Sequence, residues 1–388
     1  KLKMKNFNER IMMKEQTPYL TIDSINTARE KISTAAKLTP LQESFRLSKV
    51  FDANISLKRE DLQPVRSYKL RGAYHKIKSL FEQGKTNGGV VCASAGNHAQ
   101  GVAFACNELK INGVIFMPIT TPKQKLEQVE MFGGDFVKIK LVGDTFDASK
   151  NAAIDYSGKN GAAFIHPFDD PQIIEGQATL AMEILEQTNE KIDYVFVPIG
   201  GGGLASGLSE VFKHLSPQTK IIGVEPKGAP SMKTSIEENK NTPLKTIDKF
   251  VDGAAVKQVG DKTFEICRYN LEDIILVPEG KVCTTILRLY NIDYQSLWMD
   301  EIYTLNVASP KHSFSTIISE VNLRESFPYL YFFIMNTMFS LFGDTSIVAR
   351  IPSVIFGIAA VWMMYKFGKE TYSKKVGLIA ALLFTFNE

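Results

Sequence analysis

The chain falls into two parts that differ in the pattern of their apolar residues. Over residues 1–291, short apolar runs alternate with amphipathic stretches, whereas residues 326–387 are mostly apolar. The apolar runs of the first part are too short for helices and occupy residues 90–92, 113–117, 136–141, 194–197, 221–224 and 274–277. Between them, apolar residues recur at helical spacing, as at Leu70, Ala73 and Ile77. Strands that alternate with helices predict an α/β architecture whose parallel sheets are covered on both faces.

The composition is that of an ordinary globular protein. The chain has 45 Lys and Arg residues against 42 Asp and Glu, a net charge of +3. This near balance predicts no nucleic-acid partner. The first residues are polar and charged without an apolar core, so we expect no secretory signal. The four cysteines (Cys92, Cys106, Cys267 and Cys283) form no C-x-x-C pair, which predicts buried thiols in a reducing cytosol and no zinc site or disulfide framework.

A run of four glycines follows one predicted strand and opens a helix. Residues 200–203 are all glycine and Leu204 follows them. Glycines let successive N–H groups turn inward at a helix N-terminus, so the run predicts a phosphate cradle. A dinucleotide site is the alternative, because Gly200, Gly202 and Ala205 fit G-x-G-x-x-A and Glu225 ends the next strand.

Two further segments also place polar groups at helix starts. Lys69 follows a strand-like stretch and a Gln63-Pro64 turn, so the helix dipole and partial burial are expected to lower its pKa, as Schiff-base chemistry requires. Residues 94–101 follow the strand at residues 90–92 and present N–H groups suited to an amino-acid carboxylate. Simple helix capping is the alternative for Asn97 and His98.

Together these segments resemble one family. S-Y-K-L-R-G-A at residues 67–73, S-A-G-N-H-A-Q-G at 94–101 and G-G-G-G-L at 200–204 are similar to motifs of the threonine and serine dehydratase group of fold-type-II pyridoxal-phosphate enzymes. Residues 58–61, 167–170 and 252–256 continue the resemblance. It implies a catalytic domain over residues 1–291 with two parallel-sheet subdomains, the smaller one, about residues 82–165, inserted in the larger.

The resemblance also implies a role for each motif. Lys69 would carry pyridoxal 5'-phosphate as an internal aldimine, with Tyr68 near the cofactor ring and Asn97 bonded to its hydroxyl. The phosphate would be bound by Gly200, Gly201, Gly202, Gly203 and Leu204. The substrate carboxylate would be bound by Ser94, Ala95, Gly96, Asn97 and His98. We expect no metal, because Glu225 and Ala229 could supply oxygens but Ser231 stands where an acid is required.

The implied reaction is the elimination of water from L-threonine, and from L-serine, to give a 2-keto acid and ammonia. This is the first step of isoleucine biosynthesis, carried out in the cytoplasm by a homo-oligomer. The family pattern stops near Asn291, and neither the expected E-P-x-G-A helix nor the S-G-G-N strand follows. We therefore expect the pyridoxal-phosphate fold to be truncated and its pocket to lack one wall.

The second part of the chain contains a second set of recognisable segments, at residues 296–304, 327–331, 342–344, 349–353 and 374–377. Together these segments resemble the start of a dolichyl-phosphate-mannose-dependent membrane glycosyltransferase. Over residues 292–388 the resemblance implies an all-α, membrane-type tail, with Asp300 as the catalytic acid and Glu301 beside it. Two solvated loop acids are the alternative. Three uncharged stretches, at residues 326–343, 351–365 and 376–387, predict membrane insertion, although each is shorter than the roughly 20 residues that span a bilayer.

The two resemblances imply opposite sides of a membrane. Dehydratase chemistry belongs in the cytosol, whereas the acidic pair of the transferase belongs on the outer face, and no apolar span separates Asn291 from Asp300. We expect the join to be a fusion of two gene fragments, with a tail that makes few contacts with the first part. The alternatives to a lyase are a fragment of a sugar transferase and a non-catalytic chimeric remnant.

Overall fold

The computed structural model describes residues 19–282, 329–342, 362–363, 366 and 370. The chain divides into two compact units, residues 1–288 and 289–388.

The first unit contains a four-stranded parallel sheet with the order β5-β4-β3-β6. Its strands are β3 (Val90–Ala93), β4 (Gly113–Met117), β5 (Val137–Leu141) and β6 (Ala163–Phe164). Its helices are α4 (Lys69–Glu82), α5 (Asn97–Leu109), α6 (Lys123–Gly133) and α7 (Phe146–Asn160). Alternate residues of β3 enter different cores, because Val90 and Cys92 pack with α4 and α5 while Val91 and Ala93 pack with α7. The sheet is therefore covered on both faces, as the sequence predicts.

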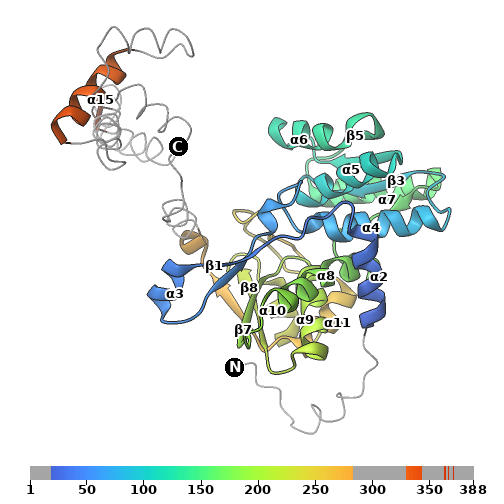
Figure 1. Ribbon diagram of the computed structural model, residues 1–388. Helices are drawn as coiled ribbons and strands as arrows, with labels where there is room; N and C mark the ends of the chain where they lie inside the picture. Colours follow the sequence, from blue (N-terminus) through green and yellow to red (C-terminus); the bar gives the residue numbers. More distant parts are fainter. Residues whose placement is uncertain (1–18, 283–328, 343–361, 364–365, 367–369, 371–388) are drawn as a thin grey trace. The chain divides into compact units, whose positions relative to one another are not determined.

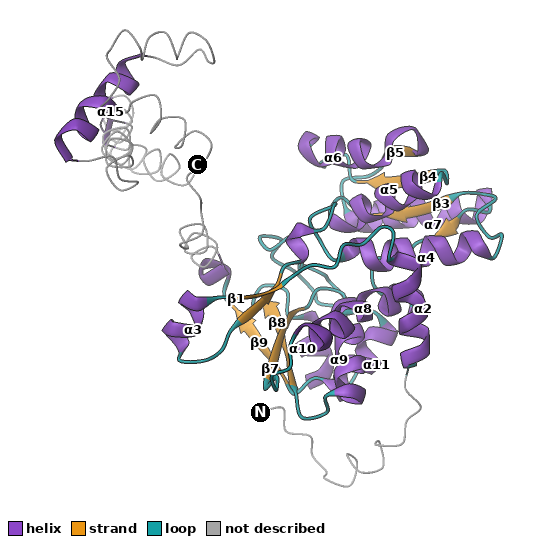
Figure 2. Ribbon diagram, in the orientation of Figure 1, coloured by secondary structure: helices purple, strands orange, loops and turns teal. Residues whose placement is uncertain are grey.

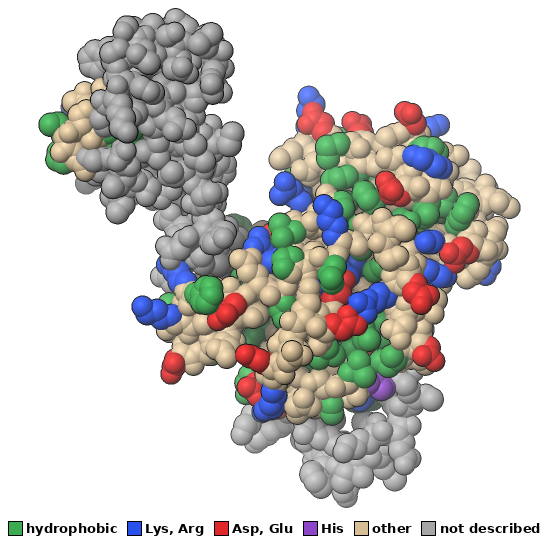
Figure 3. Space-filling view, viewed as in Figure 1, with side chains coloured by type: hydrophobic (Ala, Val, Ile, Leu, Met, Phe, Trp, Pro, Cys, Tyr) green, Lys and Arg blue, Asp and Glu red, His purple; other side chains and the backbone are tan. Residues whose placement is uncertain are grey.

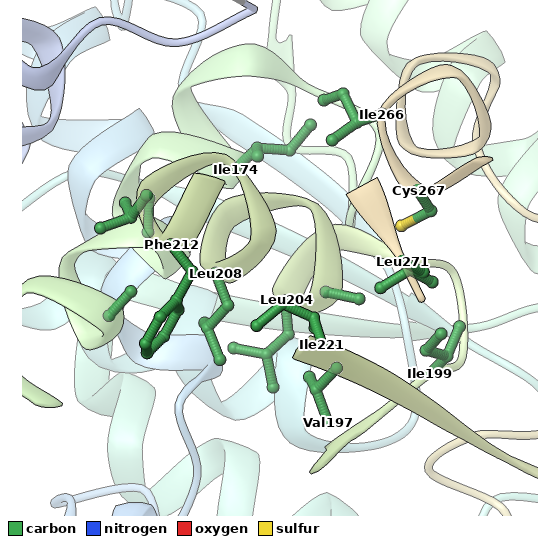
Figure 4. Packing of buried hydrophobic residues seen from close by; sticks show 14 of the residues in the cluster. Ile174, Val197, Ile199, Leu204, Leu208, Phe212, Ile221, Ile266, Cys267 and Leu271 are labelled. Carbon is green, nitrogen blue, oxygen red and sulfur yellow. The ribbon is translucent and has the colours of Figure 1, made fainter. Parts of the chain in front are cut away.

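A second parallel sheet has three strands in the order β7-β8-β9. Its strands are β7 (Tyr194–Pro198), β8 (Lys220–Pro226) and β9 (Asp273–Val277). The helices grouped with it in Figures 1 and 2 are α8 (Pro171–Gln187), α9 (Gly203–Leu215), α10 (Ser231–Glu237) and α11 (Asp261–Asn270). One face forms the largest core, in which Leu204, Leu208 and Phe212 of α9 pack against Val197 and Ile221 (Figure 4).

The opposite face of this three-stranded sheet is only partly covered in the described part of the chain. Tyr194, Phe196 and Ile275 share that face and are 52%, 62% and 44% exposed. Ile222, which pairs with Phe196 and lies on the same face, is only 7% exposed, so over the described ranges this face is covered in part. Strand pattern alone shows that a residue is apolar and does not show what packs on it.

The remaining elements of the first unit lie around these two sheets. Helix α2 (Ile22–Ile32) packs on α8 and α4. Strands β1 (Leu41–Glu43) and β2 (Ser56–Lys58) form an antiparallel pair around α3 (Phe45–Phe51), and η2 (Glu60–Leu62) and η3 (Gly134–Phe136) are short 3-10 helices. On the face shown in Figure 3, acidic and basic side chains of the described residues are interspersed, in line with the balanced composition.

The described part of the second unit is mainly the helix α15 (Tyr329–Phe342), in which Met335 and Phe339 are buried. Among the described residues, the structure contains no helix that is both long enough and apolar enough to cross a membrane. The first predicted apolar stretch thus contains a 14-residue helix. Most of the other two stretches, together with Asp300 and Glu301, lies outside the described residues.

Candidate functional site

Lys69 is the first residue of α4 and its side chain is partly buried. Its Nζ donates a hydrogen bond of 2.8 Å to the carbonyl oxygen of Pro167 and lies 5.6 Å from the ring centroid of Tyr68. Lys69 has no ion pair with any described carboxylate. Burial lowers the pKa of Lys69 from 10.5 to about 8, so the uncharged amine is accessible near neutral pH.

The segment from His166 to Asp170 connects Lys69 to the glycine run. Pro167 accepts the lysine hydrogen bond, and the next residue, Phe168, packs against the glycines: a Cβ placed on Gly201 would lie 2.2 Å from its ring. Asp169 accepts hydrogen bonds from three backbone N–H groups at the start of α11, and Asp170 caps α8. One short turn therefore fixes two helix starts and the distance from Lys69 to the glycines.

The glycine run has backbone N–H groups without partners in the described part of the chain. The carbonyl of Gly201 accepts hydrogen bonds from Thr263 Oγ1 at 2.6 Å and from the N–H of Gly260 at 3.3 Å, so it is directed toward α11. Gly202 has φ of +94°, which L side chains rarely adopt, and it precedes α9. No N–H group of residues 200–203 has a hydrogen-bond partner among the described residues. Four free donors at a helix start suit an anion such as a phosphate.

The start of α5 contains the predicted carboxylate site. Gly96 is the N-cap, Asn97 is exposed, and the N–H of Gly96 donates to Ser94 Oγ at 3.2 Å. Gly101, one turn further along α5, lies so close to α4 that a Cβ would be 3.2 Å from the carbonyl carbon of Lys69. Residues 94–97 therefore begin the helix that packs on the lysine.

His98 is the exception among the five predicted carboxylate residues. Its side chain is buried, and Nε2 lies 3.0 Å from the carbonyl oxygen of Ile165. Burial is the main cause that lowers the pKa of His98 to about 3, so the imidazole is neutral and offers no positive charge to a carboxylate. Its side chain instead links α5 to the residue after β6.

Glu225 does not face the glycine run. It is 1% exposed and its two carboxylate oxygens accept the N–H groups of Met232 at 2.8 Å and Lys233 at 2.9 Å, at the start of α10. Glu225 therefore caps helix α10, and its carboxylate is not available to bind a ribose. This argues against the dinucleotide alternative. Burial raises the pKa of Glu225 to about 7.

Comparison with known proteins shows the family of the chain. The family model described as pyridoxal-phosphate dependent enzyme matches residues 32–294. The chain belongs to this family. Its fold is the α/β core of fold type II, with parallel sheets, and the cofactor of the family is pyridoxal phosphate. A second family model, dolichyl-phosphate-mannose-protein mannosyltransferase, matches residues 326–387, so that segment is similar to part of such an enzyme.

Curated relatives of this pyridoxal-phosphate protein include biosynthetic L-threonine dehydratases. The one from Halalkalibacterium halodurans is 54% identical over 274 residues, which are 71% of this chain and 66% of the relative. The one from Bacillus subtilis is 52% identical over 280 residues, or 72% of this chain and 66% of the relative. The chain therefore spans just under two thirds of the length of these relatives.

Solved structures agree on the fold. Threonine deaminase isoform 2 from Solanum lycopersicum is 39% identical with a TM-score of 0.65, over 72% of this chain and 79% of the other. Maize serine racemase is 31% identical with a TM-score of 0.66, over 70% of this chain and 81% of the other.

The residues present fit pyridoxal phosphate. The four free N–H groups of residues 200–203 match a phosphate, and the Oγ of Ser67 is buried without a partner in the described part of the chain, two residues from Lys69. Sequence reasoning assigned no role to Ser67, His166 or Phe168. The P-F-D-D motif at residues 167–170 was the sequence signal that pointed to this turn. Strand β6 before it is only two residues long, so the sequence did not show that His166 follows the end of a strand.

Proposed function

We propose that this chain is a pyridoxal-phosphate-dependent lyase that removes water from L-threonine, and from L-serine more slowly, to give a 2-keto acid and ammonia. One observation carries the proposal: the turn that accepts the Lys69 hydrogen bond also packs on the glycine run, so amine and phosphate cradle belong to one site. The identity to threonine dehydratases supports the choice of substrate.

Each part of the site has a distinct task in this proposal. The N–H groups of residues 200–203, with Leu204 at the start of α9, bind the phosphate, and Asn97 bonds the ring hydroxyl beside Tyr68. When bound, the cofactor withdraws electrons from the substrate α-carbon. The Nζ of Lys69 would hold the cofactor, and as a free amine it would accept the α-proton of the substrate.

The substrate carboxylate binds at the start of α5 in this proposal. The N–H groups of Ala95, Asn97 and His98 and the exposed amide of Asn97 donate to it, while the side chain of His98 stays on Ile165. The N–H of Ser94 is bound to the carbonyl of Phe116 and that of Gly96 to Ser94 Oγ, so these two residues shape the turn. Specificity for threonine over serine depends on one methyl group, which is worth about 1–3 kcal/mol in a pocket. The preference is therefore modest.

The cellular setting follows from the same proposal. Residues 1–291 act in the cytoplasm, as a homo-oligomer with residues 82–165 as an inserted subdomain, and residues 326–388 associate with a membrane. Sugar transfer from a lipid phosphate, with Asp300 and Glu301 in the site, is the second candidate function and is favoured only by the match at residues 326–387. Transfer of labelled mannose from dolichyl phosphate mannose by purified protein, lost in Asp300→Asn, would support it.

The test of the lyase uses the purified chain and pyridoxal phosphate. Wild type is expected to show the visible absorbance band of lysine-bound cofactor and to release keto acid from threonine. Lys69→Ala is expected to lose both, whereas Lys78→Ala, a partly buried lysine of the same helix, is expected to retain them. A full band in Lys69→Ala would show that the assignment of Lys69 is wrong, and a band without keto acid would identify a non-catalytic remnant.

A further inference from the structure

Four charged side chains form a buried cluster at the start of α4: Lys58, Glu60, Arg71 and Glu183. Arg71 is fully buried and lies between the two carboxylates. Its Nε and Nη2 donate to Glu60 at 2.8 and 2.9 Å, and its Nη1 and Nη2 donate to Glu183 at 2.6 and 2.9 Å. Both pairs are bidentate, the arrangement that best fixes the plane of a guanidinium.

The Lys58 ammonium in this cluster has three hydrogen-bond acceptors, and the cluster has no net charge. The Nζ of Lys58 donates to Glu183 at 2.6 Å, to Gln187 at 2.9 Å and to the carbonyl of Thr39 at 2.7 Å. The two cations and two carboxylates sum to zero charge. A buried ion cluster of this kind adds little net stability over apolar side chains of equal volume. What the cluster provides instead is a fixed position and orientation of the Arg71 guanidinium.

The cluster acts on the turn that contains Lys69. The N–H of Arg71 donates to the carbonyl of Tyr68 at 3.0 Å, so these two residues close the first turn of α4 around the lysine. Tyr68, the N-cap, makes no side-chain capping bond within the described residues, and the first turn contains no acidic residue. A helix start without a cap frays unless something else holds it. On the other side, Gly101 of α5 approaches the Lys69 backbone.

We propose that Arg71, fixed by Glu60 and Glu183, is a positioning residue that holds the first turn of α4 and so directs the Lys69 amine at the carbonyl of Pro167 and the glycine run. The inference rests on the proposed role of Lys69. Arg71 acts through the backbone of Tyr68 and through helix α4. When the bidentate hydrogen bonds of the Arg71 guanidinium are lost, the first turn of α4 loosens and water reaches the Lys69 amine. The pKa of Lys69 then moves toward that of an ordinary lysine.

The experiment measures the amine directly in the whole chain without cofactor. Lysines are trace-labelled with acetic anhydride from pH 6 to 11, and the label on the Lys69 peptide is quantified by mass spectrometry. Arg71→Lys keeps the positive charge and removes the planar guanidinium that makes the bidentate hydrogen bonds. We expect the titration of Lys69 to move up by at least about one pH unit, which lowers its labelling at pH 7 about tenfold. Glu60→Gln, which keeps the side-chain volume, is expected to shift it in the same direction.

Two matched variants separate positioning from general destabilisation. Arg29→Gln breaks the exposed ion pair to Glu186 on α8, the helix that also contains Glu183. Ile77→Val removes one buried methyl group two turns along α4. Both are expected to leave the Lys69 titration unchanged. An unchanged titration in a folded Arg71→Lys or Glu60→Gln variant, or an equal shift in Ile77→Val, overturns the inference. Keto-acid formation is not measured, so a failure here is distinct from a failure of the proposed function.

Discussion

The Nζ of Lys69 lies 2.8 Å from the carbonyl oxygen of Pro167, a residue 98 positions further along the chain. The carbonyl is a neutral acceptor, so it orients the amine without the strong preference for the charged form that a carboxylate would impose. This pairing leaves burial as the cause that sets the proton affinity of the lysine.

Attachment of pyridoxal phosphate is therefore expected to depend on pH through Lys69. Its pKa is lowered to about 8, and only the neutral amine attacks an aldehyde. The rate should rise about tenfold from pH 6 to pH 7 and level off above pH 8. Stopped-flow absorbance across this range measures it. A rate that keeps rising to pH 10 would contradict the lowered pKa.

Gly201→Ala is expected to destabilise the first unit by about 1–3 kcal/mol through overpacking. The new Cβ would lie 2.2 Å from the ring of Phe168. Phe168→Ala should remove most of that additional cost, so a double-mutant cycle in urea should show coupling between the two positions. Gly158→Ala is the control, because nothing lies within 4 Å of its added Cβ. Additive effects of Gly201→Ala and Phe168→Ala would rule out the contact.

His98 is expected to make the fold sensitive to acid. Its pKa is about 3 when folded and near 6.5 when unfolded, so the unfolded chain binds a proton first and stability is lost as pH falls from 6.5 to 3. The slope is at most about 1.4 kcal/mol per pH unit. His98→Gln cannot titrate and still has a donor for Ile165. Urea unfolding at pH 7, 6, 5 and 4 should give a flatter profile for the variant, and parallel profiles would be evidence against the neutral, buried histidine.

Glu225 should act in the opposite direction. Its pKa is raised to about 7 from an ordinary 4.5, so the folded chain retains a proton that the unfolded chain has released, and stability falls as pH rises from 4.5 to 7. Glu225→Gln keeps an oxygen for the N–H of Met232 and should abolish this decline. The same urea series tests it. If the variant declines as steeply as wild type between pH 5 and 7, burial does not control this carboxyl group.

The sequence predicts local features of this chain better than distant ones. Helix α4 begins at Lys69 and the glycine run opens helix α9 at Gly203, as predicted, because each start is set by neighbouring residues. The side chain of His98 could not be placed, since its partner Ile165 is 67 positions away. The hydrogen bonds between Arg71 and Glu183 could not be predicted either, because the two residues lie 112 positions apart in the sequence.

The partly covered face of the three-stranded sheet has a thermodynamic consequence. Complete burial of a large apolar side chain contributes about 1.5–3 kcal/mol, and Tyr194, Phe196 and Ile275 are only partly buried in the described part of the chain. Any separate molecule that covers them binds the folded state and not the unfolded one, so the stability gained grows with the logarithm of its concentration above the dissociation constant, and the melting temperature rises with it.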